Sequence, residues 1–486
     1  MNKQFKNKKL TKALYAVSIG SMLAISSNSW ADDTDRLNQY TLQGTCASLP
    51  ASRTTEFHGN PETADLLLGM AGNQWVVFDQ VMRDFNAYRG LDASAPAFQE
   101  SYTLAELRAP SRGDYYFQLI PPGTIRDQIK SGCMILANID DNEEDRNFLP
   151  LSIQVDFDVF ASTNYNLMQD LARNGFVAEA LPYIRNKLDL LILEGNPNNI
   201  GVAGTNNSGL PLTGDPNYDK IFDIVMDLLN DCDRDANGCT PSDLDDLGVP
   251  VSQVDHINEG IHRGINAMYQ RMDTYIRDND PTKTEVYAGD YAAAVDAALA
   301  DVLTPQAGSP AAIRIVEEGI TTNFNLDENP NCNYADGPYA GKLRFCEYAV
   351  LNKSNSHETR VHHVETPERV RDGRQYTGPL WITEVVYAQA AEGLEPVQGV
   401  DIAAADPDEV VNRPVTYSIA RLATSASSHK QLANDFINWI RGPGQQAYID
   451  GGFIPLTDAQ LAGGECYALD KDGNLIVTPR VDNSCN

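Results

Sequence analysis

Six residues of this 486-residue chain carry neutral hydrogen-bond donors, five of them where a predicted strand gives way to a predicted helix and the sixth, Trp381, in a predicted strand. They are Gly72, Asn73, Gly123, Thr124, Thr366 and Trp381. Backbone N–H groups at a helix start, together with hydroxyl, amide and indole donors, can hold a small anion without a fixed positive charge. We therefore interpret these residues as a candidate anion site. Arg126 lies close to Thr124, but a solvated surface arginine is the simpler interpretation of it.

The elements that would position the first four residues form a repeated strand, turn and helix. Residues 65–70 are an apolar strand, 71–74 a small-residue turn, and Trp75, Phe78, Met82 and Phe85 form one face of the helix after it. The pattern returns with strands at 115–120, 158–162 and 187–193, a turn at 121–124 with a helix over 125–130, and a later strand at 415–422. Such a series predicts an α/β fold, in which turns at the carboxyl ends of strands can bind ligands.

The stretch 359–386 would position Thr366 and Trp381. We expect a strand over 359–364, a helix capped by Thr366 with Pro367 at its first position, and a helix end at Gly373. Alternating apolar and polar residues then predict a second strand over 378–386.

This stretch resembles a block found in the substrate-binding proteins of bacterial ABC importers, in the molybdate-binding-like branch of the type II periplasmic fold. The matching residues are His362, His363, Thr366, Pro367, Val370, Gly373, Trp381, Thr383 and Glu384. The segments PPGTIRDQI, DVFAST, KLDLLILEGNP and ANDFINWIRGPGQQAYIDGGFIP resemble other parts of the same proteins.

The resemblance implies a two-lobed α/β protein that carries a small anion, such as molybdate or tungstate, to an ABC transporter permease. The ligand would lie in the cleft, with Asn73 and Thr124 on one side and Thr366 and Trp381 on the other. Adjacent strand residues point to opposite faces, so one of His362 and His363 would line the cleft, and we assign His362 to the ligand. A further helix start near 215–220 would contribute, although Lys220 stands where the family has Gly.

The expected organisation has six parts. They are a signal peptide (1–31), an N-terminal arm (32–62), the first part of lobe 1 (63–188), lobe 2 (189–411) with a large insertion at about 231–355, the return of lobe 1 (412–461) and a polar C-terminal tail (462–486). The basic and then apolar start predicts export to the periplasm or secretion, without a membrane-embedded segment in the mature protein. Eight cysteines then predict disulfides, with pairs 232–239, 332–346, 466–485 and 46–133 suggested by sequence proximity.

The insertion opens with an acidic loop that has the start of a calcium-binding pattern. Asp233, Asp235 and Asn237 alternate before Gly238, and Asp243 would replace the missing glutamate of the EF-hand, whose position is taken by Leu244. A structural Ca²⁺ and an acidic turn closed by a disulfide are both compatible with this loop. No cofactor for activity is expected.

Composition and motifs exclude several functions. The formal net charge of −30 disfavours nucleic acid and anionic membranes as partners. The sequence has no hydrolase or P-loop motif. A carboxylate pair such as Glu365 and Glu384 could serve glycoside hydrolysis, but an acidic chain offers such pairs by chance. We therefore predict that the protein is not an enzyme. The alternatives are a secreted, calcium-stabilised binding module that docks a protein or surface partner through the insertion, and an unrecognised hydrolase.

Overall fold

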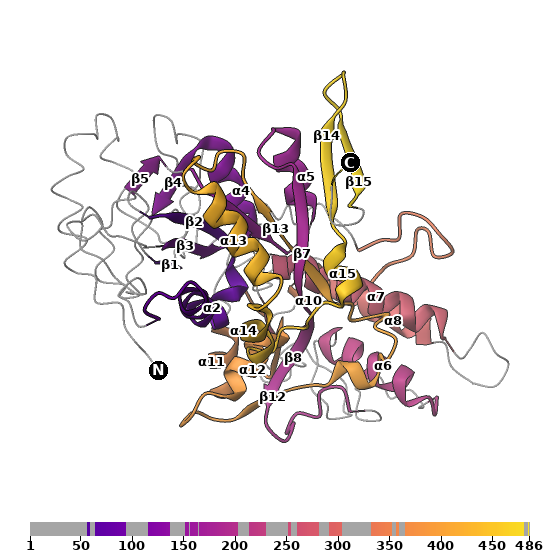
Figure 1. Cartoon of the computed structure of the whole chain (residues 1–486). Coiled ribbons are helices and arrows are strands. Elements are labelled where there is room, and N and C mark those ends of the chain that lie inside the picture. The colour runs from indigo at the N-terminus through magenta and orange to yellow at the C-terminus, as the bar shows by residue number, and fades with distance from the viewer. Residues whose placement is uncertain are drawn as a thin grey trace, which may run out of the picture. The chain divides into compact units, whose positions relative to one another are not determined.

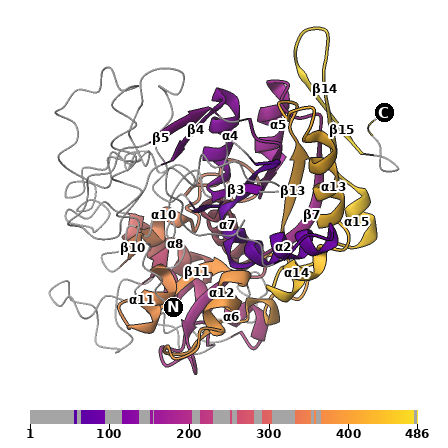
Figure 2. The ribbon, with the colours of Figure 1, turned by 60° about the vertical axis from the view of Figure 1, so that its left-hand side comes forward.

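The computed structural model describes residues 56–58, 64–93, 115–136, 151–154, 156–163, 165–202, 213–229, 251–253, 260–280, 291–303, 332–351, 356–358, 365–480 and 485. The chain forms two compact units (Figures 1 and 2). Unit 1 comprises Met1–Asn186 and Val415–Asn486, and unit 2 comprises Lys187–Pro414. The sequence analysis placed the boundaries between lobe 1 and lobe 2 at 188/189 and 411/412. The boundaries between the two units lie at 186/187 and 414/415. The expected mixed α/β fold is confirmed.

An eight-stranded sheet is the centre of unit 1, in the order β1-β3-β2-β6-β13-β7-β14-β15. The strands are β1 (Glu56–His58), β2 (Leu66–Ala71), β3 (Tyr115–Ile120), β6 (Val159–Ser162), β7 (Glu179–Asn186), β13 (Val415–Arg421), β14 (Glu465–Leu469) and β15 (Leu475–Pro479). β3, β2 and β6 are parallel, and β13 runs antiparallel to both β6 and β7. The returning strand therefore lies in the middle of the sheet. β4 (Cys133–Leu136) and β5 (Leu151–Gln154) form a separate antiparallel pair.

Helices cover both faces of this sheet, as Figures 1 and 2 show for α2, α13 and α4. One core joins the sheet to α2 (Trp75–Tyr88), α13 (Lys430–Ile440) and α14 (Gln445–Asp450). The other joins it to α4 (Pro122–Ser131) and α5 (Tyr165–Arg173). Phe78, Met82 and Phe85 of α2 are fully buried, as the helical spacing predicted. Burial of each such side chain stabilises the fold by about 1.5–3 kcal/mol.

A smaller sheet organises unit 2. β8 (Leu188–Leu193) pairs antiparallel with β11 (Thr377–Trp381) and β12 (Val397–Gly399), and β9 (Ser252–Gln253) pairs in parallel with β10 (His357–Glu358). A bridge between Val251 and Thr377 links the two groups. A Cβ at Gly378 would lie 2.3 Å from the carbonyl oxygen of Ser252, so glycine is required for this close approach of the backbones.

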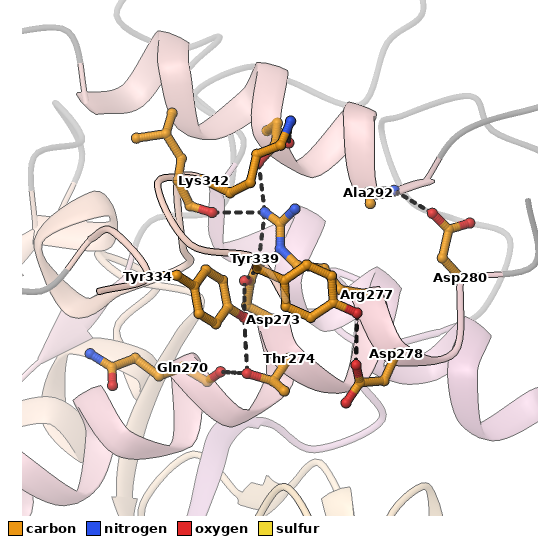
Figure 3. Close-up of polar contacts among 12 residues, drawn as sticks. Gln270, Asp273, Thr274, Arg277, Asp278, Asp280, Ala292, Tyr334, Tyr339 and Lys342 are labelled. Carbon is orange, nitrogen blue, oxygen red and sulfur yellow. Dashed lines mark hydrogen bonds and ion pairs between the residues drawn. The ribbon is translucent and has the colours of Figure 1, made fainter. Parts of the chain in front are cut away.

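The helices of unit 2 within the described residues include α6 (Pro216–Leu229), α7 (Gly260–Asp278), α8 (Tyr291–Leu303), α10 (Glu347–Leu351), α11 (Glu365–Arg371) and α12 (Ile382–Gln389). Arg277 of α7 is buried and bonds to Asp273, to Asp296 of α8 and to the carbonyl of Leu343. Figure 3 shows this network between two helices and the loop that the Cys332–Cys346 disulfide closes. Whether 231–355 is an insertion stays a prediction.

Three expectations were wrong in detail. The strand predicted over 378–386 ends at Trp381, and α12 begins at Ile382 because Glu384 accepts a hydrogen bond from the Trp381 N–H, as an N-terminal cap does. The helix predicted to start after Thr366 begins at Glu365, and its end before Gly373 is confirmed. The turn predicted over 121–124 is mostly helical, since α4 begins at Pro122.

The predicted polar C-terminal tail contains a β-hairpin that extends the main sheet beyond β7 (Figure 1). The predicted 466–485 disulfide holds it, and the 332–346 disulfide is also present. Cys46 of the 46–133 pair, both cysteines of the 232–239 pair, the signal peptide and most of the N-terminal arm lie outside the described residues. Among the described helices, none has the length and apolar character needed to span a membrane.

Candidate functional site

Three parallel strands of unit 1 end at the same edge of the sheet, and a helix follows each of them. The register pairs Ala71 of β2 with Ile120 of β3, and Gly69 of β2 with Phe160 of β6. Two residues beyond Phe160 is Ser162, the end of β6. The starts of α2 (through the 3-10 turn Gly72–Gln74), α4 and α5 therefore gather at one edge, where their N–H groups favour an anion.

Gly72 and Asn73 lie at this edge as predicted from sequence. A Cβ on Gly72 would approach the Ile120 carbonyl carbon to 3.3 Å, so a small residue suits the close contact with the neighbouring strand end. Asn73 is 2% exposed, and its Nδ2 donates a hydrogen bond to the hydroxyl of Tyr417 on β13. The side-chain amide thus has a fixed orientation.

Gly123 and Thr124 lie beside them, in the first turn of α4. The N–H of Thr124 donates to the carbonyl of Pro121 at 2.9 Å, so the helix itself uses this donor. The side chain of Thr124 is almost buried. The part of Thr124 that remains for a ligand is therefore its hydroxyl.

Two hydroxyls at this edge were missed by the sequence analysis. Thr163 directly follows β6 and is 3% exposed, and Ser418 is fully buried opposite Ser162 in the register of β13 with β6. Neither hydroxyl has a hydrogen-bond partner within the described part of the chain. The strand–turn–helix pattern could have pointed to Thr163, but no local signal connects Ser418 to a strand more than 250 residues earlier.

The surroundings of Asn73 are apolar and neutral. Tyr183, Tyr417 and Tyr448 are fully buried, with the ring centroids of Tyr417 and Tyr448 at 6.2 and 5.9 Å from that of Tyr183. Tyr448 donates its hydroxyl proton to Oε1 of Gln74 at 2.7 Å. Burial raises the pKa of Tyr183 and of Tyr448 well above the usual value, so both phenols stay protonated at physiological pH.

Arg126 does not add a free positive charge to this edge. Its guanidinium lies 2.7 Å from a carboxylate oxygen of Asp127 and 3.5 Å from one of Asp170. The edge therefore offers neutral donors, and the interpretation of Arg126 as a surface arginine fits these pairs.

The start of α6 in unit 2, a further anion contact implied by the family resemblance, is capped by the chain itself. Oδ1 of Asp215 accepts hydrogen bonds from the N–H groups of Asn217 and Tyr218. Lys220 is bonded to the carbonyl of Asp401 at 2.8 Å. A carboxylate thus occupies the position that an anionic ligand would need.

Thr366 and Trp381 lie in unit 2, and both are buried. The Thr366 hydroxyl is 3.0 Å from that of Ser252, which leaves it one further hydrogen bond to make. Trp381 is 1% exposed, and its ring would lie 3.6 Å from a Cβ built on Gly264, so the indole packs in the interior of unit 2.

The other predicted site residues lie outside the described residues. They are His362 and the four candidate calcium ligands Asp233, Asp235, Asn237 and Asp243. Within the described ranges, no group of three or more His, Cys, Asp or Glu side chains could hold a metal ion.

Comparison with solved structures gives distant similarities. The periplasmic molybdate-binding protein of Azotobacter vinelandii is 11% identical, with 81% of this chain and 100% of that chain covered and a TM-score of 0.37. A tungstate-binding protein of Desulfovibrio alaskensis G20 is 11% identical (81% and 99% covered, TM-score 0.37). An iron-bound protein of Pseudomonas aeruginosa is 13% identical (81% and 86% covered, TM-score 0.37). We carry over no ligand from proteins this distant.

No curated protein sequence matches the chain. A family model described as bacterial extracellular solute-binding protein matches residues 121–454, which is more than half of the chain. The match includes Gly123, Thr124, Thr163, Thr366, Trp381 and Tyr417, and begins after Gly72 and Asn73. The prediction that the protein is not an enzyme is confirmed, and the chain belongs to the bacterial extracellular solute-binding protein family, whose members serve ABC transporters.

Proposed function

We propose that the protein captures a small oxyanion, of the molybdate or tungstate kind, in the periplasm and delivers it to the permease of an ABC importer. The observation that carries the proposal is the common edge of β2, β3 and β6 in unit 1. Three helix starts meet there, and the buried hydroxyl of Thr163 forms no hydrogen bond within the described residues. Buried donors without a partner are costly, and a bound anion would satisfy them.

The neutral character of the edge supports an anion held by hydrogen bonds alone. Asn73, Gly123, Thr124 and Thr163 can donate protons but carry no charge. The whole chain has a net charge of −30, so long-range attraction does not favour anion binding. The affinity must then come from short-range donors, and we expect it to change little with ionic strength.

Unit 2 carries the remaining residues of the predicted ligand set. We assign this contribution to Thr366, Trp381 and His362, as the family resemblance implies. The Thr366 hydroxyl can act as donor to a ligand while it accepts from Ser252.

Calorimetry on the purified mature protein tests the proposal, with molybdate, tungstate, sulfate and phosphate as separate ligands. Thr124→Val and Thr163→Val remove a hydroxyl while they preserve the side-chain volume. Hydrogen bonds to charged groups contribute about 1.5–3 kcal/mol, so each change should weaken binding roughly 10- to 100-fold. Thr478→Val on the exposed strand β15 is the matched control and should bind as the wild type does.

Two outcomes would contradict the proposal. The first is that none of the four oxyanions binds the wild type. The second is that one of them binds with equal affinity to the wild type and to both threonine variants. No contact among the described residues favours the alternative, a calcium-stabilised module that docks a partner through 231–355.

A further inference from the structure

A single hydrogen bond fixes the one amide side chain of the candidate anion site. Nδ2 of Asn73 donates to the hydroxyl oxygen of Tyr417, and both side chains are at most 2% exposed. The two residues are 344 positions apart in the sequence, and both belong to unit 1. Tyr417 lies on β13, in the part of unit 1 that resumes after unit 2.

The geometry of a side-chain amide makes this bond consequential. The two hydrogens of an amide NH₂ group lie in one plane, so a bond from one of them fixes the direction of the other. The hydrogen that Tyr417 does not take is the one that Asn73 can offer to a ligand. The orientation of that donor is therefore set before any ligand arrives.

Tyr417 is itself held firmly in place. Its ring packs edge-to-face against Tyr183 (centroids 6.2 Å apart) and Phe453 (5.9 Å apart), in the core beneath α2 and α14. On β13 it is opposite Ile184 of β7, with a register shift between Tyr417 and Ser418. A residue fixed by a strand on one side and by two rings on the other has little freedom to move away from Asn73.

We propose that Tyr417 is a positioning residue, which holds the Asn73 amide in the orientation that binds the anion. This inference rests on the proposed function and adds a specific role to that site. Immobilising a side chain on binding costs about 0.5–1.5 kcal/mol, and the bond to Tyr417 removes that cost from the binding step. Preorganised neutral donors also discriminate among anions by the positions of their oxygens.

The test is a double-mutant cycle on oxyanion affinity, measured by calorimetry with the oxyanion that binds the wild type most tightly. Tyr417→Phe removes only the hydroxyl and should weaken binding by about tenfold, which corresponds to about 1.4 kcal/mol. Asn73→Ala should weaken binding at least as much. In the Asn73→Ala background, Tyr417→Phe should have no further effect on affinity, because the donor it positions is gone.

Tyr183→Phe is the matched control. Tyr183 is buried in the same aromatic cluster, edge-to-face with Tyr417, and the Asn73 amide donates to Tyr417 and not to Tyr183. Loss of this hydroxyl should leave affinity unchanged. The melting temperature of each variant without ligand separates a loss of stability from a loss of binding, since a purely structural role of Tyr417 would lower stability and leave the cycle additive.

Each result has a definite meaning. If the wild type binds no oxyanion, the proposed function and this inference both fall. If the wild type binds but Tyr417→Phe binds equally well, or the two changes are additive, only the role of Tyr417 is wrong. Should Tyr417→Phe fail to fold, NMR of the ligand-free wild type replaces it: the Asn73 NH₂ protons should exchange slowly with solvent, and fast exchange would overturn the inference.

Discussion

Replacing Arg277 with methionine should strongly destabilise the part of unit 2 that α7, α8 and the Cys332–Cys346 loop form (Figure 3). The Arg277 guanidinium is 2.9 Å from Asp273 and 2.6 Å from Asp296, and it donates to the Leu343 carbonyl at 2.8 Å. Methionine keeps the length of the side chain and removes all of these bonds. Asp273, which is fully buried, would keep the hydrogen bond from Tyr334 but lose its positive partner.

The magnitude follows from the burial of the pair. Removal of one partner of a buried ion pair costs about 3–5 kcal/mol, because an uncompensated charge stays in the interior. The matched control is Arg374→Met, whose pair with Asp372 has a similar length but is exposed on both sides. That exposed pair should contribute no more than about 1 kcal/mol.

The cost should also depend on pH. Burial raises the pKa of Asp273 and Arg277 lowers it, so loss of Arg277 raises this pKa further. A carboxyl group whose folded pKa is raised takes up its proton at a higher pH in the folded state than in the unfolded state. The destabilisation by Arg277→Met should therefore be full at pH 7–8 and become smaller as the pH falls and Asp273 is protonated.

Native-state hydrogen exchange, read by mass spectrometry on peptides that cover 260–278, assigns the effect to α7. A loss of 3–5 kcal/mol corresponds to exchange faster by roughly two to three and a half powers of ten. The double variant Arg277→Met/Asp273→Asn should recover part of the protection, since no unpaired charge remains. Protection in Arg277→Met within tenfold of wild type at pH 7.5 would refute this account of the network.

Three more predictions concern other carboxylates. Burial raises the pKa of Asp189 on β8 to about 6. Between about pH 4 and pH 6 the folded state therefore keeps a proton that the unfolded state has released, and the free energy of unfolding falls as the pH rises through this range. Asp189→Asn should thus stabilise unit 2 at pH 7 by on the order of 1–3 kcal/mol in urea denaturation, with no gain at pH 3.5; an equal gain at both pH values would contradict this. Asp406 accepts hydrogen bonds from three backbone N–H groups at 410–412, so Asp406→Ala should cost several kcal/mol in the same assay, and a cost below 1 kcal/mol would show that this loop is held by other contacts. If the acidic loop binds Ca²⁺, a chelator should lower the melting temperature of the wild type but not that of the double variant Asp233→Ala/Asp235→Ala. A chelator that leaves the melting temperature of the wild type unchanged would show that the loop is only a turn.

Much of the candidate site could be predicted from the sequence, because its signals are local. The apolar strand 66–71, the small-residue turn after it and the helical spacing of Phe78, Met82 and Phe85 lie within twenty residues of one another. Strand, turn and helix are determined over such short distances by backbone preference and side-chain periodicity. Gly72, Asn73, Gly123 and Thr124 were found in this way.

Local patterns failed where two local preferences competed. The alternation over 378–386 indicated a strand, but Glu384 caps the Trp381 N–H and turns the chain into α12. The sequence of 462–486 indicated a polar tail with a Cys466–Cys485 disulfide but not the hairpin β14–β15, which forms because β14 pairs with the edge of β7. In the second case the pairing partner of β14 lies far away in the chain, where no local pattern shows it.

The sequence by itself determined the family, the mixed α/β class and the helix starts that could bind an anion. Only the tertiary structure decided how those donors are used: that the N–H of Thr124 serves its own helix, that Asp215 caps α6, and that Tyr417 holds the Asn73 amide across 344 residues. The physical reason is that a hydrogen bond depends on distances below about 3.5 Å, which strand register and core packing set between residues that no local pattern connects.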